Sequence, residues 1–328
     1  MKAVIDNLRR EAVRLLANDE VKMVIGYGEG TDASRTTPYF ASTPEQSAAF
    51  TWGPLCANNL AKHLLDYRYE DTRLAVVVKG CDSRGINRLL QDLQFPRERL
   101  VVLGVPCGGQ LDRNLIAPEI PPGARLQGIE DTGKVYVLVT DKGRLSFPKD
   151  RFLMPKCYLC ETNMPVVADF MAGDPVPSPA REGSDRTAEV NEIEALDVAA
   201  RSSFWDNEFS RCLRCNACRN VCPACSCKEC VFEQAVPGWQ QSGIIGSKAN
   251  SLPENMVFHL VRMFHVIGRC VDCGECERVC PVDIPLRLLY RKTLKDAHIL
   301  YGAGTPGMST EVQSPLSEFS PEDPEEFM

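Results

Sequence analysis

The sequence has little histidine and no long apolar run. Only 4 of its 328 residues are His, and it contains no Ser-His-Asp arrangement, paired-carboxylate motif or phosphate loop that indicates independent substrate chemistry. The longest apolar runs, such as Leu74–Val78 and Val101–Val105, are far shorter than the roughly 18 residues that span a bilayer. The sequence therefore predicts no direct membrane span.

The sequence also lacks an excess of positive charge, with 37 Lys and Arg against 44 Asp and Glu. The formal net charge is −7, and the carboxylates of residues 302–328 account for six of these charges, while that segment has no Lys or Arg. The rest of the chain is therefore nearly neutral and has no basic field for nucleic acid. We expect residues 302–328 to form a disordered acidic tail.

Cysteine, in contrast, is abundant, with 16 residues. The N-terminal stretch MKAVIDNLRREAVRLL has the pattern of a charged amphipathic helix and lacks the apolar core of a secretory signal. Because structural disulfides belong to oxidising compartments, we expect a cytoplasmic protein whose cysteines bind metal instead of forming disulfides.

The cysteines divide the chain unevenly. Residues 1–160 hold five of them, whereas residues 212–280 hold the other eleven in two tight groups. A stretch rich in Pro, Gly and Ser begins at Met171 and has the composition of an interdomain linker. We predict four segments: an α/β domain over 1–172, a linker and helix over 173–204, a helical domain over 205–301 and the tail over 302–328.

Apolar runs alternate with helical patterns in the first domain, which is typical of βαβ units in a parallel sheet. Two further runs flank Asp141-Lys-Gly and predict a hairpin appended to that sheet. The second domain shows helical patterns, so we expect it to be mostly α-helical. The expected strands are 21–27, 73–79, 100–105, 134–140 and 144–147, and the expected helices are 56–66, 83–93, 186–201, 254–266 and 286–298.

The motif CxxCxxCxxxCP occurs twice, at residues 212–223 and 270–281. Three thiolates at this spacing can surround one 4Fe-4S cluster, while the fourth, followed by Pro, is directed to the other cluster. Zinc is the alternative, but tetrahedral zinc sites favour pairs of CxxC. The crossed pairing predicts two ligand sets: Cys212, Cys215, Cys218 and Cys280 for cluster 1, and Cys270, Cys273, Cys276 and Cys222 for cluster 2.

The connection between the two motifs is long. Forty-seven residues separate Cys222 from Cys270, and they include the expected helix over 254–266. A compact bacterial ferredoxin has a much shorter connection. Residues 205–300 therefore resemble the helical dicluster ferredoxin domains of heterodisulfide reductase and of succinate dehydrogenase iron-sulfur subunits.

A further set of cysteines follows the expected strands of the first domain. Cys81 and Cys107 each come just after a strand, and the carboxyl ends of neighbouring parallel strands share one edge, where ligands bind. Cys157 and Cys160 add a CxxC. We predict that these four residues hold cluster 3, a third iron-sulfur cluster; buried structural thiols are the alternative.

Three segments carry a family resemblance: VVKGCDSRGI at 77–86, VLGVPCGG at 102–109 and CYLCETNMPVVADFMAGD at 157–174. Residues 20–175 resemble the beta subunits of coenzyme F420-reducing hydrogenase and formate dehydrogenase. The resemblance implies a flavin, FAD, beside an iron-sulfur cluster, and exchange of electron pairs with a soluble two-electron carrier. It implies cluster ligands at Cys107, Cys157 and Cys160, with Cys81 and Cys56 competing for the fourth position.

The same resemblance directs attention to a flavin region. We assign to it Gly28, Gly30, Cys56, Asn58 and Lys79. Residues 26–30 follow only a GxGxG pattern, so a turn is an equally open interpretation of these glycines.

The remaining residues leave several interpretations open. Cys225, Cys227 and Cys230 lie close to the first motif, and with Cys56 they could hold a fourth metal centre, supply alternative ligands or be ordinary thiols. His259 and His265 are six residues apart on one expected helix, so they cannot form an i, i+4 metal pair. We expect solvated or tuning roles for the histidines.

These observations predict an electron-transfer iron-sulfur subunit, flavin-binding by resemblance, within a multi-subunit oxidoreductase of formate dehydrogenase, hydrogenase or heterodisulfide reductase type. Such a subunit is a redox relay and takes its catalytic and other redox subunits as partners, in anaerobic metabolism. The alternative is a self-contained flavin-dependent reductase of coenzyme F420 or NAD(P).

Overall fold

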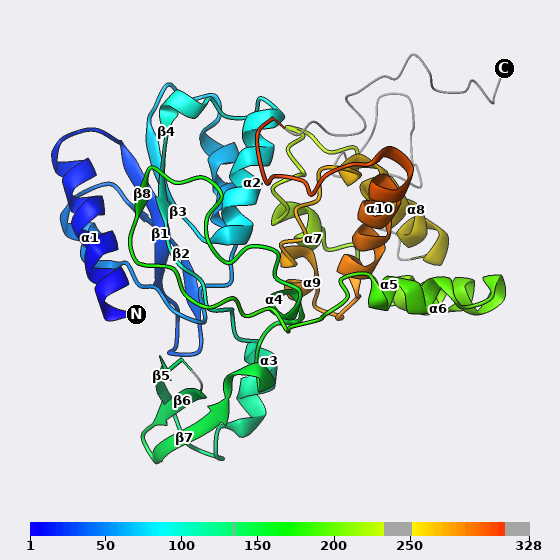
Figure 1. Cartoon of the computed structure of the whole chain (residues 1–328), viewed down its shortest axis with the longest axis horizontal. Helices are drawn as coiled ribbons and strands as arrows, with labels where there is room; N and C mark the ends of the chain where they lie inside the picture. Colours follow the sequence, from blue (N-terminus) through cyan, green and yellow to red (C-terminus); the bar gives the residue numbers. More distant parts are fainter. Residues whose placement is uncertain (134, 233–250, 312–328) are drawn as a thin grey trace. The chain divides into compact units, whose positions relative to one another are not determined.

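The chain folds into two compact units, Met1–Ser184 and Asp185–Met328. The structure is a computed structural model, and it describes residues 1–133, 135–232 and 251–311 (Figure 1). Residue 134 and most of the expected acidic tail, residues 312–328, lie outside the described part. No helix within the described part is long and apolar enough to cross a membrane.

The first unit is built on a five-stranded sheet with the order β2-β1-β3-β4-β8. The pairs β1/β3, β3/β4 and β4/β8 are parallel, as expected, but β2 runs antiparallel to β1. The expectation of a parallel sheet is therefore corrected to a mixed sheet. Residues 30–35 join β1 to β2, and so short a link cannot make the crossover that parallel strands require. The strands are β1 (Met23–Glu29), β2 (Thr36–Ala41), β3 (Leu74–Val78), β4 (Leu100–Gly104) and β8 (Phe170–Met171).

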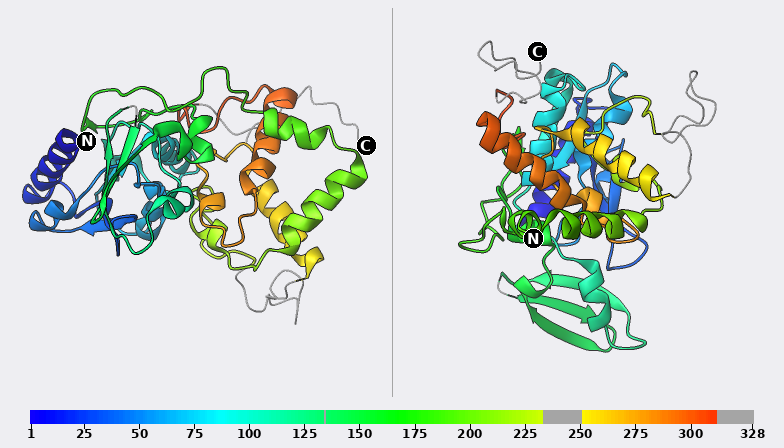
Figure 2. Two further views of the ribbon diagram at one scale, coloured as in Figure 1. Left: turned by 90° about the horizontal axis from the view of Figure 1, so that it is seen from below. Right: turned by 90° about the vertical axis from the view of Figure 1, so that its right-hand side faces the viewer.

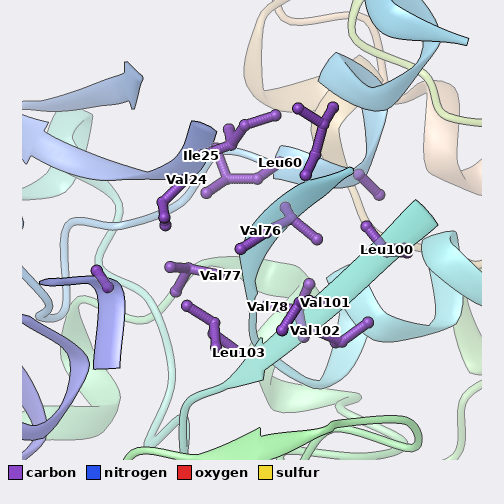
Figure 3. Packing of buried hydrophobic residues seen from close by; sticks show 14 of the residues in the cluster. Val24, Ile25, Leu60, Val76, Val77, Val78, Leu100, Val101, Val102 and Leu103 are labelled. Atoms are coloured by element: carbon purple, nitrogen blue, oxygen red, sulfur yellow. The ribbon is translucent and has the colours of Figure 1, made fainter. Parts of the chain in front are cut away.

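Helix α1 (Lys2–Ala17) covers one face of this sheet and α2 (Gly80–Gln91) covers the other (Figure 1). Because both faces are covered, β3 and β4 are apolar throughout and all of their residues are buried. Figure 3 shows their side chains packed with Leu60 in the core. The segment Leu60–Tyr67 is a 3-10 helix that begins after Asn59, whose side chain accepts a hydrogen bond from Ala61 N at 3.1 Å, so the helix expected over 56–66 starts later than predicted.

The expected hairpin forms as β6 (Val135–Thr140) and β7 (Gly143–Pro148), but it is not appended to the main sheet. It pairs with β5 (Leu126–Asp131) in a separate antiparallel sheet, which stands apart from the first in Figure 2. The free side of β4 is taken by β8, so that edge is closed to the hairpin. The short helices of this unit are α3 (Arg113–Ile116) and α4 (Pro155–Tyr158).

The regular elements in the described part of the second unit are helices. The helix expected over 186–201 is two helices, because Asp197 accepts a hydrogen bond from Ala200 N at 2.8 Å and starts α6. Helix α8 begins at a capping box in which Ser251 and Glu254 satisfy each other's backbone N–H groups. The helices are α5 (Ala188–Glu194), α6 (Val198–Ser210), α7 (Ala217–Asn220), α8 (Leu252–Val266), α9 (Glu275–Arg278) and α10 (Leu286–Tyr301).

Candidate metal centres

The two cysteine motifs of the second unit adopt the same local backbone. In each CxxCxxC run, the residue before the second cysteine and the residue after it have positive φ: Arg214 at 50° and Asn216 at 59° in the first, Asp272 at 50° and Gly274 at 71° in the second. Left-handed residues reverse the direction of the chain. Each run therefore curls into a loop before its short helix, α7 or α9.

A cavity in the second unit is lined by Cys212, Cys215 and Cys218 of the first motif and by Cys280 of the second. Backbone N–H groups point at two of these sulfurs: Arg214 N donates to Cys212 Sγ and Ile284 N to Cys280 Sγ, each at 3.4 Å. Such bonds stabilise thiolates that ligate iron. The four residues assigned to cluster 1 thus meet at one cavity.

A second cavity is lined by the complementary set, Cys270, Cys273 and Cys276 with Cys222. Cys273 and Cys276 are buried, and Cys222 and Cys270 are half-buried. Within the described ranges, no group of three or more His, Cys, Asp or Glu converges on a single ion. Four thiols around a cavity are a donor set that fits a 4Fe-4S cluster. The crossed pairing nevertheless stays a prediction.

Helix α8 contributes a histidine to the first cavity that sequence reasoning treated only as solvated or tuning. His259 Nε2 lies 3.3 Å from Cys212 Sγ, and the ring stacks on Phe209 with centroids 4.7 Å apart. Burial, followed by the charges of Arg262 and Arg214, lowers the pKa of His259 to about 3, so the imidazole is neutral. His259 and Arg262 are three residues apart on one helix and so share a face. This spacing was the signal in the sequence that both side chains approach the same site.

Of the cysteines assigned to cluster 3, Cys81 and Cys107 follow the carboxyl ends of β3 and β4, which are neighbours as expected, while Cys157 and Cys160 lie in and just after α4. Gln110 joins two of them: its N donates to Cys157 Sγ at 3.2 Å and its Nε2 to Cys107 Sγ at 3.4 Å. Burial, with smaller contributions from Cys107 and Cys157, raises the pKa of Cys160 to about 12.

Two cysteines near Cys107, Cys81 and Cys56, are candidates for the fourth position of this set. Burial raises the pKa of Cys81, with smaller contributions from Asp82 and Cys107. Burial also raises the pKa of Cys56 to about 12, with a smaller contribution from Cys107. Cys81 and Cys56 therefore remain alternative fourth members.

The residues assigned to the flavin region are only partly brought together. Lys79 Nζ donates to Asn58 O at 2.7 Å, to Tyr27 OH at 2.8 Å and to Asp82 Oδ2 at 2.8 Å. Lys79 is therefore held in a buried ion pair.

The two glycines of that region lie at the end of β1, Gly28 within the strand and Gly30 directly after it. A Cβ on Gly28 would lie 3.0 Å from Tyr39 Cβ, and one on Gly30 would lie 2.7 Å from Arg35 Cβ. Close packing of the β1–β2 hairpin therefore accounts for both glycines, although only Gly30 lies in the turn and Gly28 is paired within β1.

The first unit holds a cavity of about 420 Å³ that sequence reasoning missed. Trp52, Gly108, Gly109 and Gln110 line it, together with the ion pair between Lys149 and Asp131 at 2.6 Å. Gln110 is 2% exposed and has an Oε1 without a hydrogen-bond partner. The Gly-Gly pair directly after Cys107 was the signal in the sequence.

The four remaining cysteines, which were predicted as a possible fourth metal centre, do not all lie in one unit. Cys56 belongs to the first unit and Cys225, Cys227 and Cys230 to the second. A side-chain hydrogen bond between Cys222 and Cys225, then burial, raises the pKa of Cys222, so these two thiols are in contact. Cys227 is exposed. The fourth metal centre stays a prediction.

Two families match the chain. Residues 71–195 match the C-terminal region of coenzyme F420 hydrogenase/dehydrogenase beta subunits, and residues 208–284 match the family described as 4Fe-4S dicluster domain. The F420-dependent formate dehydrogenase subunit beta of Methanocaldococcus jannaschii is 24% identical, over 85% of this chain and 85% of that protein. The F420-dependent formate dehydrogenase 1 subunit beta of Methanococcus maripaludis is also 24% identical, over 94% and 92%.

Solved structures are similar as well. Among them, a chain of the xenon-derivatised F420-reducing NiFe hydrogenase complex from Methanosarcina barkeri aligns at a TM-score of 0.38 and 15% identity, over 48% of this chain and 62% of that one. The family matches confirm the resemblance seen in the sequence: residues 71–195 are similar to coenzyme F420 hydrogenase/dehydrogenase beta subunits, and residues 208–284 are similar to 4Fe-4S dicluster domains.

Proposed function

We propose that this protein is an electron-transfer iron-sulfur subunit of a multi-subunit oxidoreductase of formate dehydrogenase, hydrogenase or heterodisulfide reductase type. The observation that carries the proposal is the pair of cavities in the second unit, each lined by four cysteines drawn from both motifs. Its curated relatives are beta subunits of F420-dependent formate dehydrogenases. The partners are the catalytic and other redox subunits.

We take residues 205–301 as a mostly helical dicluster domain, preceded along the chain by the 173–204 linker and helix. Each of its two ligand sets holds one cluster. A bound 4Fe-4S cluster supplies one-electron transfer. Cys212, Cys215, Cys218 and Cys280 hold cluster 1, and neutral His259 and Arg214 N bond to Cys212 Sγ. Cys222, Cys270, Cys273 and Cys276 hold cluster 2. The 302–328 segment follows as an acidic tail.

In the first unit, with its α/β domain over 1–172, Cys107, Cys157, Cys160 and either Cys81 or Cys56 hold cluster 3. FAD binds beside it, and a flavin supplies the change between electron pairs and single electrons. Of the two candidate places, the 420 Å³ cavity is favoured over the region around Lys79. Gln110 supports this choice, because it lines the cavity and also bonds to two cysteines of the set.

Quantification of iron, sulfide and flavin in one anaerobic preparation of the full chain tests this proposal. Two clusters require about eight irons and three require about twelve, at four irons per cluster. Zinc in place of iron and sulfide would contradict the relay, and a flavin-free protein would remove the first-unit proposal alone. The relay is expected to be cytoplasmic.

A self-contained reductase is the second candidate, because a flavin bound in the cavity of the first unit could be reduced directly by a soluble carrier. Reduction of the flavin by F420 or NADH in the isolated chain would support this activity. A chain that is reduced only in the presence of its partner subunits would support the relay. The two outcomes are read from the same flavin absorbance.

A further inference from the structure

Arg262 of α8 lies between the two candidate cluster sites of the second unit: it contacts Cys218 of the first and lines the cavity of the second. Its Nη1 donates to Cys218 Sγ at 3.1 Å, and its Nη2 donates to Cys218 O at 3.1 Å. The same side chain lines the second cavity, where Cys222 also lies. One guanidinium therefore touches a ligand of cluster 1 and the cavity of cluster 2.

The charge of Arg262 has no carboxylate partner in the part of the chain that the structure describes. The groups that face it are the Tyr290 phenol and the thiols of Cys218, Cys222, Cys225 and Cys276, with the neutral His259 ring beside it. Arg287, another buried arginine at the second cavity, instead pairs with Asp272 at 2.9 Å.

A buried cation is strongly unfavourable unless an anion balances it. Arg262 is 3% exposed, so the groups that can balance its charge are the sulfurs around it, as thiolates when they ligate a cluster. A cluster with four thiolate ligands is anionic and gains one more negative charge on reduction. A cation bonded to a ligand sulfur therefore stabilises the reduced form more than the oxidised form, and this raises the reduction potential.

We propose that Arg262 is a positioning residue that raises the reduction potential of cluster 1 relative to cluster 2. Cluster 1 receives the larger effect, because the N–H of Arg262 bonds directly to its ligand Cys218, whereas Arg262 only lines the cavity of cluster 2. Arg262 thereby shifts the distribution of an electron in the second unit toward cluster 1. This inference rests on the proposed function, since it needs both clusters.

The test is a redox titration followed by electron paramagnetic resonance on the anaerobic full chain. Arg262→Gln removes the charge and is expected to lower the reduction equilibrium constant of cluster 1 at least tenfold, which is about 59 mV for one electron. The shift of cluster 2 is expected to be smaller. Arg262→Lys keeps the charge and loses the two-pronged contact, so cluster 1 shifts by less than in Arg262→Gln.

Two further variants complete the design. Cys215→Ser identifies the signal of cluster 1, because it removes one ligand of that cluster. Cys215 is the exposed member of the set, so its replacement disturbs the packing least. Lys292→Gln is the matched control: it removes one positive charge from α10, where Lys292 pairs with Glu194 and Asp296 and lines neither cavity. Both potentials should stay at the wild-type values in this control.

The outcomes separate the inference from the proposed function. Wild-type protein without two cluster signals would refute the function, and the inference with it. Two normal signals whose potentials do not move in Arg262→Gln, or move equally, would overturn the inference alone. If Arg262→Gln does not retain iron, Arg262→Lys decides: a selective lowering of cluster 1 supports the inference, and unchanged or equally shifted potentials overturn it.

Discussion

The buried ion pair of Lys79 and Asp82 allows a sharp test of what Lys79 does. The two side chains are 1% and 0% exposed, and Lys79 Nζ lies 2.8 Å from Asp82 Oδ2. Removal of one partner of a buried pair costs about 3–5 kcal/mol, because the other charge is left uncompensated. We therefore expect Lys79→Met to destabilise the first unit by about that amount.

The double variant Lys79→Met with Asp82→Leu should regain most of the lost stability. It removes both charges together, and Tyr27 OH keeps its hydrogen bond to Asn58 O at 2.7 Å. The Asp82→Leu change alone should behave like Lys79→Met, because it strands the ammonium instead of the carboxylate. This recovery by a second substitution distinguishes a paired structural role from a simple loss of fold.

The measurement is hydrogen exchange of the β3 amides, Leu74–Val78, in the full chain, together with flavin content. A loss of about 3 kcal/mol speeds exchange roughly a hundredfold, if the amides exchange through opening of the unit. We expect this acceleration in both single variants and not in the double variant, with flavin retained in the double variant. Exchange unchanged in Lys79→Met but flavin lost would refute the reasoning and make Lys79 a cofactor contact.

Two further predictions concern the clusters. Cys280→Ser should abolish the signal assigned to cluster 1 and leave cluster 2, whereas Cys222→Ser should do the opposite; the reverse pattern in resonance spectra would disprove the crossed pairing. Gly80→Ala should lower the iron content by about four per chain, the content of cluster 3, because the added Cβ would lie 2.1 Å from Thr162 O, next to the CxxC segment. Gly53→Ala, where the nearest atom is 3.8 Å away, should retain all iron, and equal retention in both would count against the clash.

The sequence predicted the elements that depend on local pattern. The apolar runs of β3 and β4 and the helical period of α8 follow from neighbouring residues, so their positions agree with expectation to within a few residues. The predictions were wrong where the structure depends on which strands pair with each other. The antiparallel β2 and the separate β5–β7 sheet depend on the sheet edge with which each strand pairs. The hydrophobic periodicity of a strand does not specify that edge.

The cysteine spacing by itself determined that two loops with the same pattern exist, because CxxCxxC is a local arrangement whose left-handed positions lie between the cysteines. Only the tertiary structure decided what surrounds each loop. Arg262 is 44 residues from Cys218 and His259 is 47 from Cys212, yet α8 brings each of them to a sulfur of the set assigned to cluster 1. Such contacts arise from the packing of a distant helix, so spacing in the sequence could not predict them.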